Sequence, residues 1–198
     1  MVRWDERTAL VVVDVQNDFA DPDGGLSVAG GDAIIPAVNE AIADARAAGA
    51  CVAYTQDWHP PDTPHFAKDG GIWPVHCVQD SWGAEFHPDL CVVGEVVRKG
   101  TGGEDGYSGF TVRDPASGDP SDTLLDSLLR DRGVTTVAIA GLATDYCVRD
   151  TALDAVGRGF AAFVLIDAVR AVDLQAGDGA RALEAMRRAG VRSALASR

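Results

Sequence analysis

Short apolar runs, each followed by a helical pattern, recur along this chain and limit its fold more than any other feature. The clearest run is Thr8 to Val15 (TALVVVDV), and comparable runs cover Ala50 to Gln56, Val134 to Ala140 and Phe160 to Asp167. Near-continuous apolar runs are typical of strands that are buried on both faces of a sheet. Strands that alternate with helices predict a parallel sheet that is covered by helices on both sides.

The remaining segments continue the alternation. Two more strands are expected over Cys91 to Arg98 and Val191 to Ala196. Apolar residues at helical spacing predict four helices, which run from Ile34 to Gly49, from Leu124 to Gly133, from Thr144 onward, and from Gly179 to Ala189. No repeat, low-complexity tract or linker interrupts the pattern, so residues 1–198 are expected to form a single α/β domain.

Composition excludes several classes of partner. Thirty acidic residues against 17 Lys and Arg give a formal charge of -13. This charge disfavours nucleic acids and anionic membranes as partners. No apolar run is long enough to span a membrane, and the N-terminus has no secretory pattern. The four cysteines form no C-x-x-C pair, and Cys51 and Cys91 lie in strand-like runs, so a reduced, cytoplasmic protein is expected.

Four candidate reactive groups follow expected strands directly. Asp14, Asp57 and Lys99 each come at or just past a strand end, and the turn Gly141 to Cys147 follows the strand that begins at Val134. In open parallel sheets, ligands bind beyond the carboxyl ends of the strands, where the strand order reverses. These groups are therefore expected to meet at one edge of the sheet.

The stretch from Gly141 to Val148 (GLATDYCV) is the candidate nucleophile turn. Thr144 is a credible N-cap, which would place Cys147 in the first turn of a helix. The free amides and the positive end of the helix dipole there favour a thiolate and can hold an oxyanion. Read alone, the same cysteine fits a buried structural thiol equally well.

Asp14 and Lys99 supply what a cysteine nucleophile lacks. A thiol needs a proton acceptor to attack an amide, and the leaving amine needs that proton back. A partly buried carboxylate suits both steps, and a lysine beside it favours the charged forms of the carboxylate and the thiol. Taken singly, Asp14 also fits a loop cap, and Lys99 a solvated strand end.

All four histidines lie between positions 59 and 87. Asp57 and His59 point to the same side of an extended backbone, and His65 and His76 follow. Such a set suits a first-row divalent ion, although exposed loop histidines are the ordinary alternative. His87 precedes a proline and is expected to be structural. Phe19, Trp73 and Tyr146 lie near these groups in the sequence and are either pocket walls or core residues.

The chain resembles the nicotinamidases among the isochorismatase-like cysteine hydrolases. The resemblance rests on motifs in a fixed order along the chain: DVQNDF (14–19), TQDWH (55–59), WPVHC (73–77), RKG (98–100), YSGF (107–110) and GLATDYCVRDTA (141–152). It implies a three-layer α/β/α fold whose six-stranded parallel sheet has the order 3-2-1-4-5-6. It also implies a cis peptide between Leu142 and Ala143.

The resemblance also implies roles for individual residues. It assigns Cys147 as the nucleophile, Asp14 as the proton shuttle and Lys99 as the third member of the triad, with the amides of Ala143 and Cys147 as the oxyanion hole. The metal ligands would be Asp57, His59, His65 and His76, holding one zinc, iron or manganese ion. The substrate pocket would be formed by Phe19, Trp73, Leu142, Tyr107 and Tyr146.

The implied reaction is hydrolysis of nicotinamide to nicotinate and ammonia through a Cys thioester, in pyridine nucleotide salvage. Two alternatives stay open: a related amidohydrolase that acts on another small amide or carbamoyl compound, and a non-catalytic binding protein on the same scaffold. The sequence leaves the oligomeric state open, so a homo-oligomer is neither required nor excluded.

Overall fold

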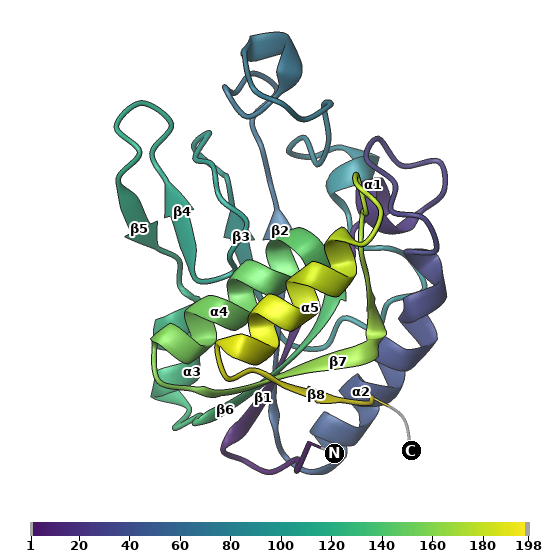
Figure 1. Ribbon diagram of the computed structural model, residues 1–198, viewed down its shortest axis with the longest axis vertical. Helices are drawn as coiled ribbons and strands as arrows, with labels where there is room; N and C mark the ends of the chain where they lie inside the picture. The colour runs from purple at the N-terminus through teal and green to yellow at the C-terminus, as the bar shows by residue number, and fades with distance from the viewer. Residues whose placement is uncertain (1, 197–198) are drawn as a thin grey trace.

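A parallel six-stranded sheet forms the centre of the protein, and the computed structural model describes residues 2–196 (Figure 1). The strand order is β3-β2-β1-β6-β7-β8, which is the 3-2-1-4-5-6 order expected for the six strands of the sheet. The strands are β1 (Thr8–Val13), β2 (Cys51–Asp57), β3 (Glu95–Lys99), β6 (Thr136–Leu142), β7 (Ala161–Arg170) and β8 (Arg192–Ala194).

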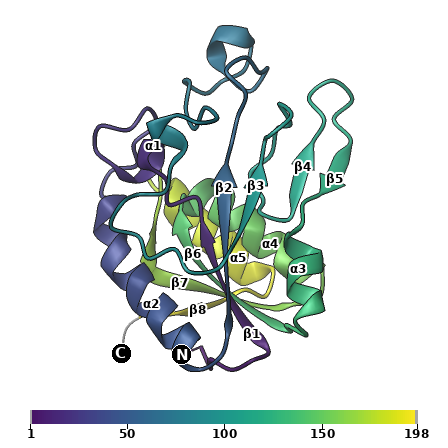
Figure 2. The ribbon, with the colours of Figure 1, turned by 180° about the vertical axis from the view of Figure 1, so that it is seen from behind.

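Helices cover both faces of the sheet, as expected. They are α1 (Asn17–Ala20), α2 (Ile35–Ala47), α3 (Leu125–Asp131), α4 (Arg149–Gly157) and α5 (Asp178–Arg188). Figure 2 shows α2 against one face, and Figure 1 shows α4 and α5 across the other. Alternation along β1 separates the two cores, because Leu10 and Val12 pack toward α2 whereas Val11 and Val13 pack toward α3, α4 and α5.

Several expected boundaries were wrong. The third strand begins at Glu95 rather than Cys91, and Cys91 is exposed. The polar segment from Gly100 to Asp119 also contains a strand that the sequence did not indicate. This strand, β4 (Thr111–Arg113), pairs antiparallel with β5 (Pro120–Asp122) in a separate hairpin.

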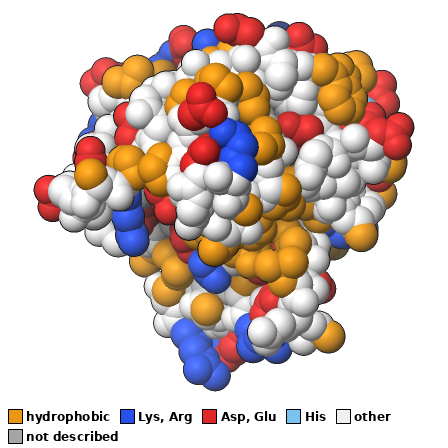
Figure 3. Space-filling view, turned by 90° about the horizontal axis from the view of Figure 1, so that it is seen from above, with side chains coloured by type: hydrophobic (Ala, Val, Ile, Leu, Met, Phe, Trp, Pro, Cys, Tyr) orange, Lys and Arg blue, Asp and Glu red, His pale blue; other side chains and the backbone are white. Residues whose placement is uncertain are grey.

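The two connections above the carboxyl edge of the sheet build the upper part of the molecule. Residues 58–94 join β2 to β3 with only short 3₁₀ turns, and the β4–β5 hairpin rises beside them (Figures 1 and 2). Seen from above, this face carries patches of apolar side chains among acidic ones (Figure 3). Among residues 2–196, no helix is long and apolar enough to cross a membrane.

Candidate active site

Neighbouring strands bring the candidate reactive residues to one edge of the sheet. Asp57 and Lys99 are paired residues at the ends of β2 and β3, and Asp14 follows β1 with a φ of 50°. Cys147 lies in a π-helical turn, Thr144–Val148, that follows β6. The fold therefore brings together, as the strand-end pattern predicted, residues that are up to 133 positions apart.

Gly141 allows β6 to approach β1 closely just before this turn. Its φ is 111°, and a Cβ there would lie 2.1 Å from the carbonyl oxygen of Val13. Only glycine avoids that contact, because it has no Cβ. The next peptide bond but one, between Leu142 and Ala143, is cis, as the resemblance implied.

Lys99 is the centre of a buried ionic cluster. Its Nζ lies 3.0 Å from Oδ2 of Asp14, donates to Oδ1 of Asp57, and lies 3.7 Å from Sγ of Cys147. Thr55 donates a hydrogen bond of 2.6 Å to the other oxygen of Asp14. The three predicted catalytic residues are therefore in mutual contact, and each is buried.

Burial and the neighbouring charges set the protonation states of the cluster. Burial raises the pKa of Asp14 despite the opposing charge of Lys99, which makes this carboxylate a stronger base than an exposed one. Burial also acts on Asp57, but Lys99 and the nearby histidines outweigh it and lower the pKa of Asp57. For Lys99, burial is outweighed by the carboxylates, so its pKa is raised and it stays charged.

The surroundings of Cys147 oppose the expected thiolate. Burial raises the pKa of Cys147 well above its ordinary value, and the carboxylates of Asp14 and Asp57 raise it further, against the charge of Lys99. The helical turn begins at Thr144 as predicted, but the N-cap assignment was wrong, because Ala143 is the N-cap and makes no side-chain capping bond. Cys147 consequently needs a base before it can attack, and Asp14 is within hydrogen-bonding reach.

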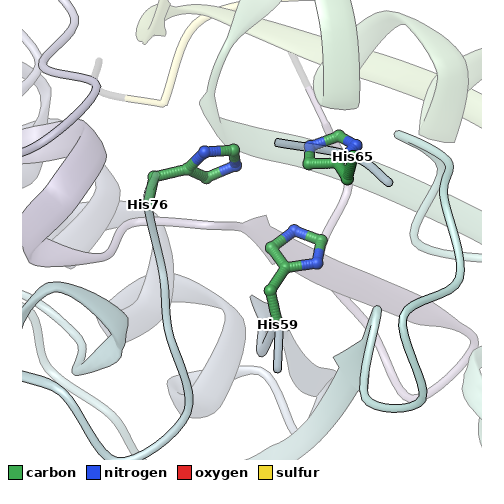
Figure 4. Close-up of side chains that lie close together, drawn as sticks. All are labelled: His59, His65 and His76. Carbon is green, nitrogen blue, oxygen red and sulfur yellow. The ribbon is translucent and has the colours of Figure 1, made fainter. Parts of the chain in front are cut away.

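Three buried histidines form a second cluster beside the ionic one. The side chains of His59, His65 and His76 point toward a common centre (Figure 4), and one nitrogen from each lies within 4.8 Å of the others. The rings of His59 and His65 stack at 4.7 Å. Gly100 leaves room for this arrangement, because a Cβ there would lie 2.6 Å from the ring of His59.

The chemistry of these donors fits a metal ion. Both ring nitrogens of His59 are buried without a hydrogen-bond partner, which is costly for a polar group unless a ligand takes them. His76 donates from Nδ1 to the carbonyl of Pro74, so its Nε2 carries a lone pair, and burial lowers the pKa of His76 to about 4. Asp57 reaches this cluster, with Oδ2 at 3.7 Å from Nε2 of His59 and 3.9 Å from Nε2 of His76.

A narrow pocket joins the two clusters. The five predicted substrate-binding residues, Phe19, Trp73, Tyr107, Leu142 and Tyr146, all line it. Cys147 and Ala143 also line it, together with His65, His76 and Asp57. The rings of Trp73, Tyr107 and Tyr146 contact one another edge to face at 5.0 to 6.3 Å. The aromatic residues thus line the pocket, and Phe19 also packs in the hydrophobic core.

Sequence reasoning missed several residues of the site. Leu26, Val28 and Val172 complete the apolar wall, and Asp105 accepts a hydrogen bond from His65. His87 lies apart from the pocket: its Nε2 is 3.9 Å from Asp21, and its Nδ1 accepts from the amide of Asp89. Nothing in the local pattern marks Val172 or Asp105, because each reaches the site through a tertiary contact.

Comparison with known proteins identifies the family. The isochorismatase domain matches residues 8–195. The chain belongs to this family. It is 41% identical to the nicotinamidase/pyrazinamidase of Mycobacterium tuberculosis, and the match covers 92% of this chain and 96% of that protein.

Two solved structures share the fold of this isochorismatase-family chain. The pyrazinamidase of Pyrococcus horikoshii in complex with zinc is 43% identical, with a TM-score of 0.84 over 96% of this chain and 99% of that one. PnC1 from L. infantum in complex with nicotinate is 35% identical, with a TM-score of 0.87 over 99% and 96% of the two chains.

Proposed function

We propose that this isochorismatase-family protein hydrolyses nicotinamide to nicotinate and ammonia. The observation that carries the proposal is the single narrow pocket that reaches both the Cys147 cluster and the histidine cluster. A flat molecule with an amide at one end and a basic nitrogen at the other matches these two ends. The relatives named nicotinamidase or pyrazinamidase, and the zinc and nicotinate complexes among the similar structures, support the same substrate class.

The histidine cluster is proposed to hold one divalent ion. His59, His65, His76 and Asp57 would be its protein ligands, and zinc, iron and manganese are all compatible with this set of donors. The ion would accept the ring nitrogen of nicotinamide as a further ligand and so fix the ring in the pocket. Phe19 and the three mutually packed aromatic residues, Trp73, Tyr107 and Tyr146, would exclude water from the bound ring.

Asp14 and Cys147 carry out the first chemical step. The raised pKa of Asp14 lets this carboxylate take the proton from Sγ of Cys147 while the sulfur bonds to the amide carbon. Lys99, 3.7 Å from the sulfur, stabilises the charge that develops during the transfer. The carboxamide oxygen gains the negative charge, and the amides of Ala143 and Cys147 would hold it.

The same carboxylate completes the reaction. As the C–N bond breaks, Asp14 returns its proton to the departing nitrogen, and ammonia leaves a nicotinoyl thioester on Cys147. Water then gives a proton to Asp14 and bonds to the thioester carbon. The S–C bond breaks, nicotinate leaves, and Cys147 regains a proton. Each proton that Asp14 accepts is therefore returned within the cycle.

Three wider expectations rest on the composition and on the resemblance, and they remain predictions. They are a cytoplasmic location, the lack of a nucleic-acid partner, and residues 1–198 as one domain. All four cysteines are free, which is compatible with a reducing compartment. A homo-oligomer stays open in the same way.

The test is the Cys147→Ala variant. We expect it to release no ammonia from nicotinamide and still to bind the compound, because the aromatic and histidine parts of the pocket wall are unchanged. Cys91→Ala is the matched control, since this exposed thiol lies outside the pocket and should keep full activity. Turnover by Cys147→Ala at the wild-type rate would refute the assignment of the nucleophile.

A panel of small amides tests the substrate. Nicotinamide and pyrazinamide should be preferred over amides that lack a ring nitrogen. The opposite preference would favour the alternative amidohydrolase function, and an inert metal-loaded protein would favour the non-catalytic one.

A further inference from the structure

Asp105 is the only side chain among residues 2–196 that is hydrogen-bonded to a ring nitrogen of the three clustered histidines. Its Oδ1 lies 2.7 Å from Nδ1 of His65. The ring of His76 donates a hydrogen bond to a backbone carbonyl, and the ring of His59 has no hydrogen-bond partner. Sequence reasoning placed His65 in the candidate ion site but gave Asp105 no role.

The hydrogen bond determines which nitrogen of His65 faces the cluster. A carboxylate can only accept, so Nδ1 of His65 must carry the proton. The lone pair of the neutral ring is then on Nε2, the nitrogen that remains for an ion. Metal-binding histidines are commonly oriented in this way by a carboxylate, which also makes the ligating nitrogen more basic.

The loop around Asp105 holds the carboxylate in place. The same Oδ1 accepts the amide of Gly106 at 2.8 Å, and the backbone of Asp105 exchanges two hydrogen bonds with Arg113 of β4, at 2.8 and 2.6 Å. Thr63 also donates a hydrogen bond of 3.2 Å to the carbonyl of Gly103. The Gly106 amide thus holds the Asp105 carboxylate directly, and the other bonds hold the backbone of the loop that carries it.

Two residues further along, the same loop forms part of the pocket wall. Tyr107 accepts a hydrogen bond of 3.1 Å from Nε1 of Trp73, which lies in the loop that also carries His65 and His76. The loop of residues 103–107 and the histidine loop are therefore joined at the ion cluster and at the aromatic wall.

We propose that Asp105 is a positioning residue that fixes the tautomer and orientation of His65 for ion binding, and that the loop of residues 103–107 couples this site to the aromatic wall. The proposal rests on the ion site of the proposed function. It assigns to Asp105 no contact with the substrate or with the ion.

The first experiment measures zinc affinity in competition with a chromophoric chelator, using the full chain. Asp105→Ala should bind zinc about 10- to 100-fold more weakly, the range typical of losing such a partner. Asp105→Asn should lose less, because its amide oxygen still accepts. Glu104→Gln is the matched control: it removes the same charge from the same loop, where Glu104 contacts the amide of Gly102 and not His65.

Two further measurements separate positioning from general damage. The melting temperature of metal-free Asp105→Ala should equal that of wild type within error. The visible spectrum of the cobalt-substituted protein should change in Asp105→Ala and stay unchanged in Glu104→Gln, since only the former disturbs a ligand. At limiting zinc, Asp105→Ala should raise KM for nicotinamide, and saturating zinc should restore KM to the wild-type value.

The outcomes also distinguish this proposal from the one on which it rests. Zinc affinity that is unchanged in Asp105→Ala but lost in His65→Ala would refute the role of Asp105 and leave the ion site standing. Unchanged affinity in His65→Ala would refute the positioning role too, because the residue being positioned would not be a ligand. A wild-type protein that binds no zinc would refute the ion site itself.

Discussion

Replacing Lys99 with methionine tests the ionic cluster on which the mechanism depends. The substitution keeps the length of the side chain and removes its charge. Lys99 is 2% exposed and contacts Asp14 and Asp57, so the variant leaves two buried carboxylates without their cation. Breaking a buried ion pair in this way typically costs about 3–5 kcal/mol of unfolding free energy.

The cost can be measured as a change in melting temperature. For a domain of this size, 1 kcal/mol corresponds to roughly 2–4 °C, so metal-free Lys99→Met should melt about 6 to 20 °C below the wild type near neutral pH. Thermal unfolding followed by tryptophan fluorescence gives the midpoint. Lys68→Met is the matched control, because Lys68 also has two carboxylate partners, Asp62 and Asp69, but lies at the surface. Its midpoint should not move.

The loss of thermal stability in Lys99→Met should depend on pH in a known direction. Burial already raises the pKa of Asp14, and loss of Lys99 removes the largest opposing influence, so this pKa rises further in the variant. A group whose pKa is higher in the folded than in the unfolded state stabilises the fold at low pH and loses that contribution as the pH rises. The deficit should therefore be smaller in mildly acidic than in alkaline buffer. A midpoint equal to that of the wild type, or a deficit that is the same in both buffers, would refute the description of the cluster.

Two more predictions concern the base and the ion. Thr55→Val removes a hydrogen bond that lowers the pKa of Asp14. The acid limb of the kcat/KM profile should therefore shift to higher pH. An acid limb that stays in place would argue against Asp14 as the base. Chelation should raise KM for nicotinamide more than it lowers kcat, and added zinc should reverse the effect, whereas kinetics indifferent to chelator would contradict a working ion site.

The sheet and the reactive residues on its edge could be predicted, because each depends on a local pattern. Apolar runs marked the strands, and the residues just past them had to share an edge once the strands were parallel. The boundaries were less predictable where tertiary contacts decide them. Cys91 continues an apolar run, yet β2 pairs with β3 only from Glu95.

The remaining features depend on contacts that no local pattern records. The strands of the β4–β5 hairpin are three residues each and largely exposed, so they carry no periodicity. Asp105 meets His65 across 40 positions, between two irregular loops. The protonation of Cys147 depends on how deeply the fold buries it, and the dipole argument, which considers one turn alone, gave the opposite preference.

The reacting residues and the residues that would contact the substrate belong to different parts of the fold. Lys99 and Asp57 end two of four adjacent strands, and Asp14 and Cys147 follow the other two, so the separation of about 4.8 Å between hydrogen-bonded strands governs their spacing. Most of the residues that would contact a bound ring, such as Phe19, Trp73 and Tyr107, belong to the connections instead. Such connections tolerate insertion and exchange far better than paired strands do. A lineage built on this scaffold could therefore acquire new amide substrates by altering its loops while its bond-breaking residues stay in register.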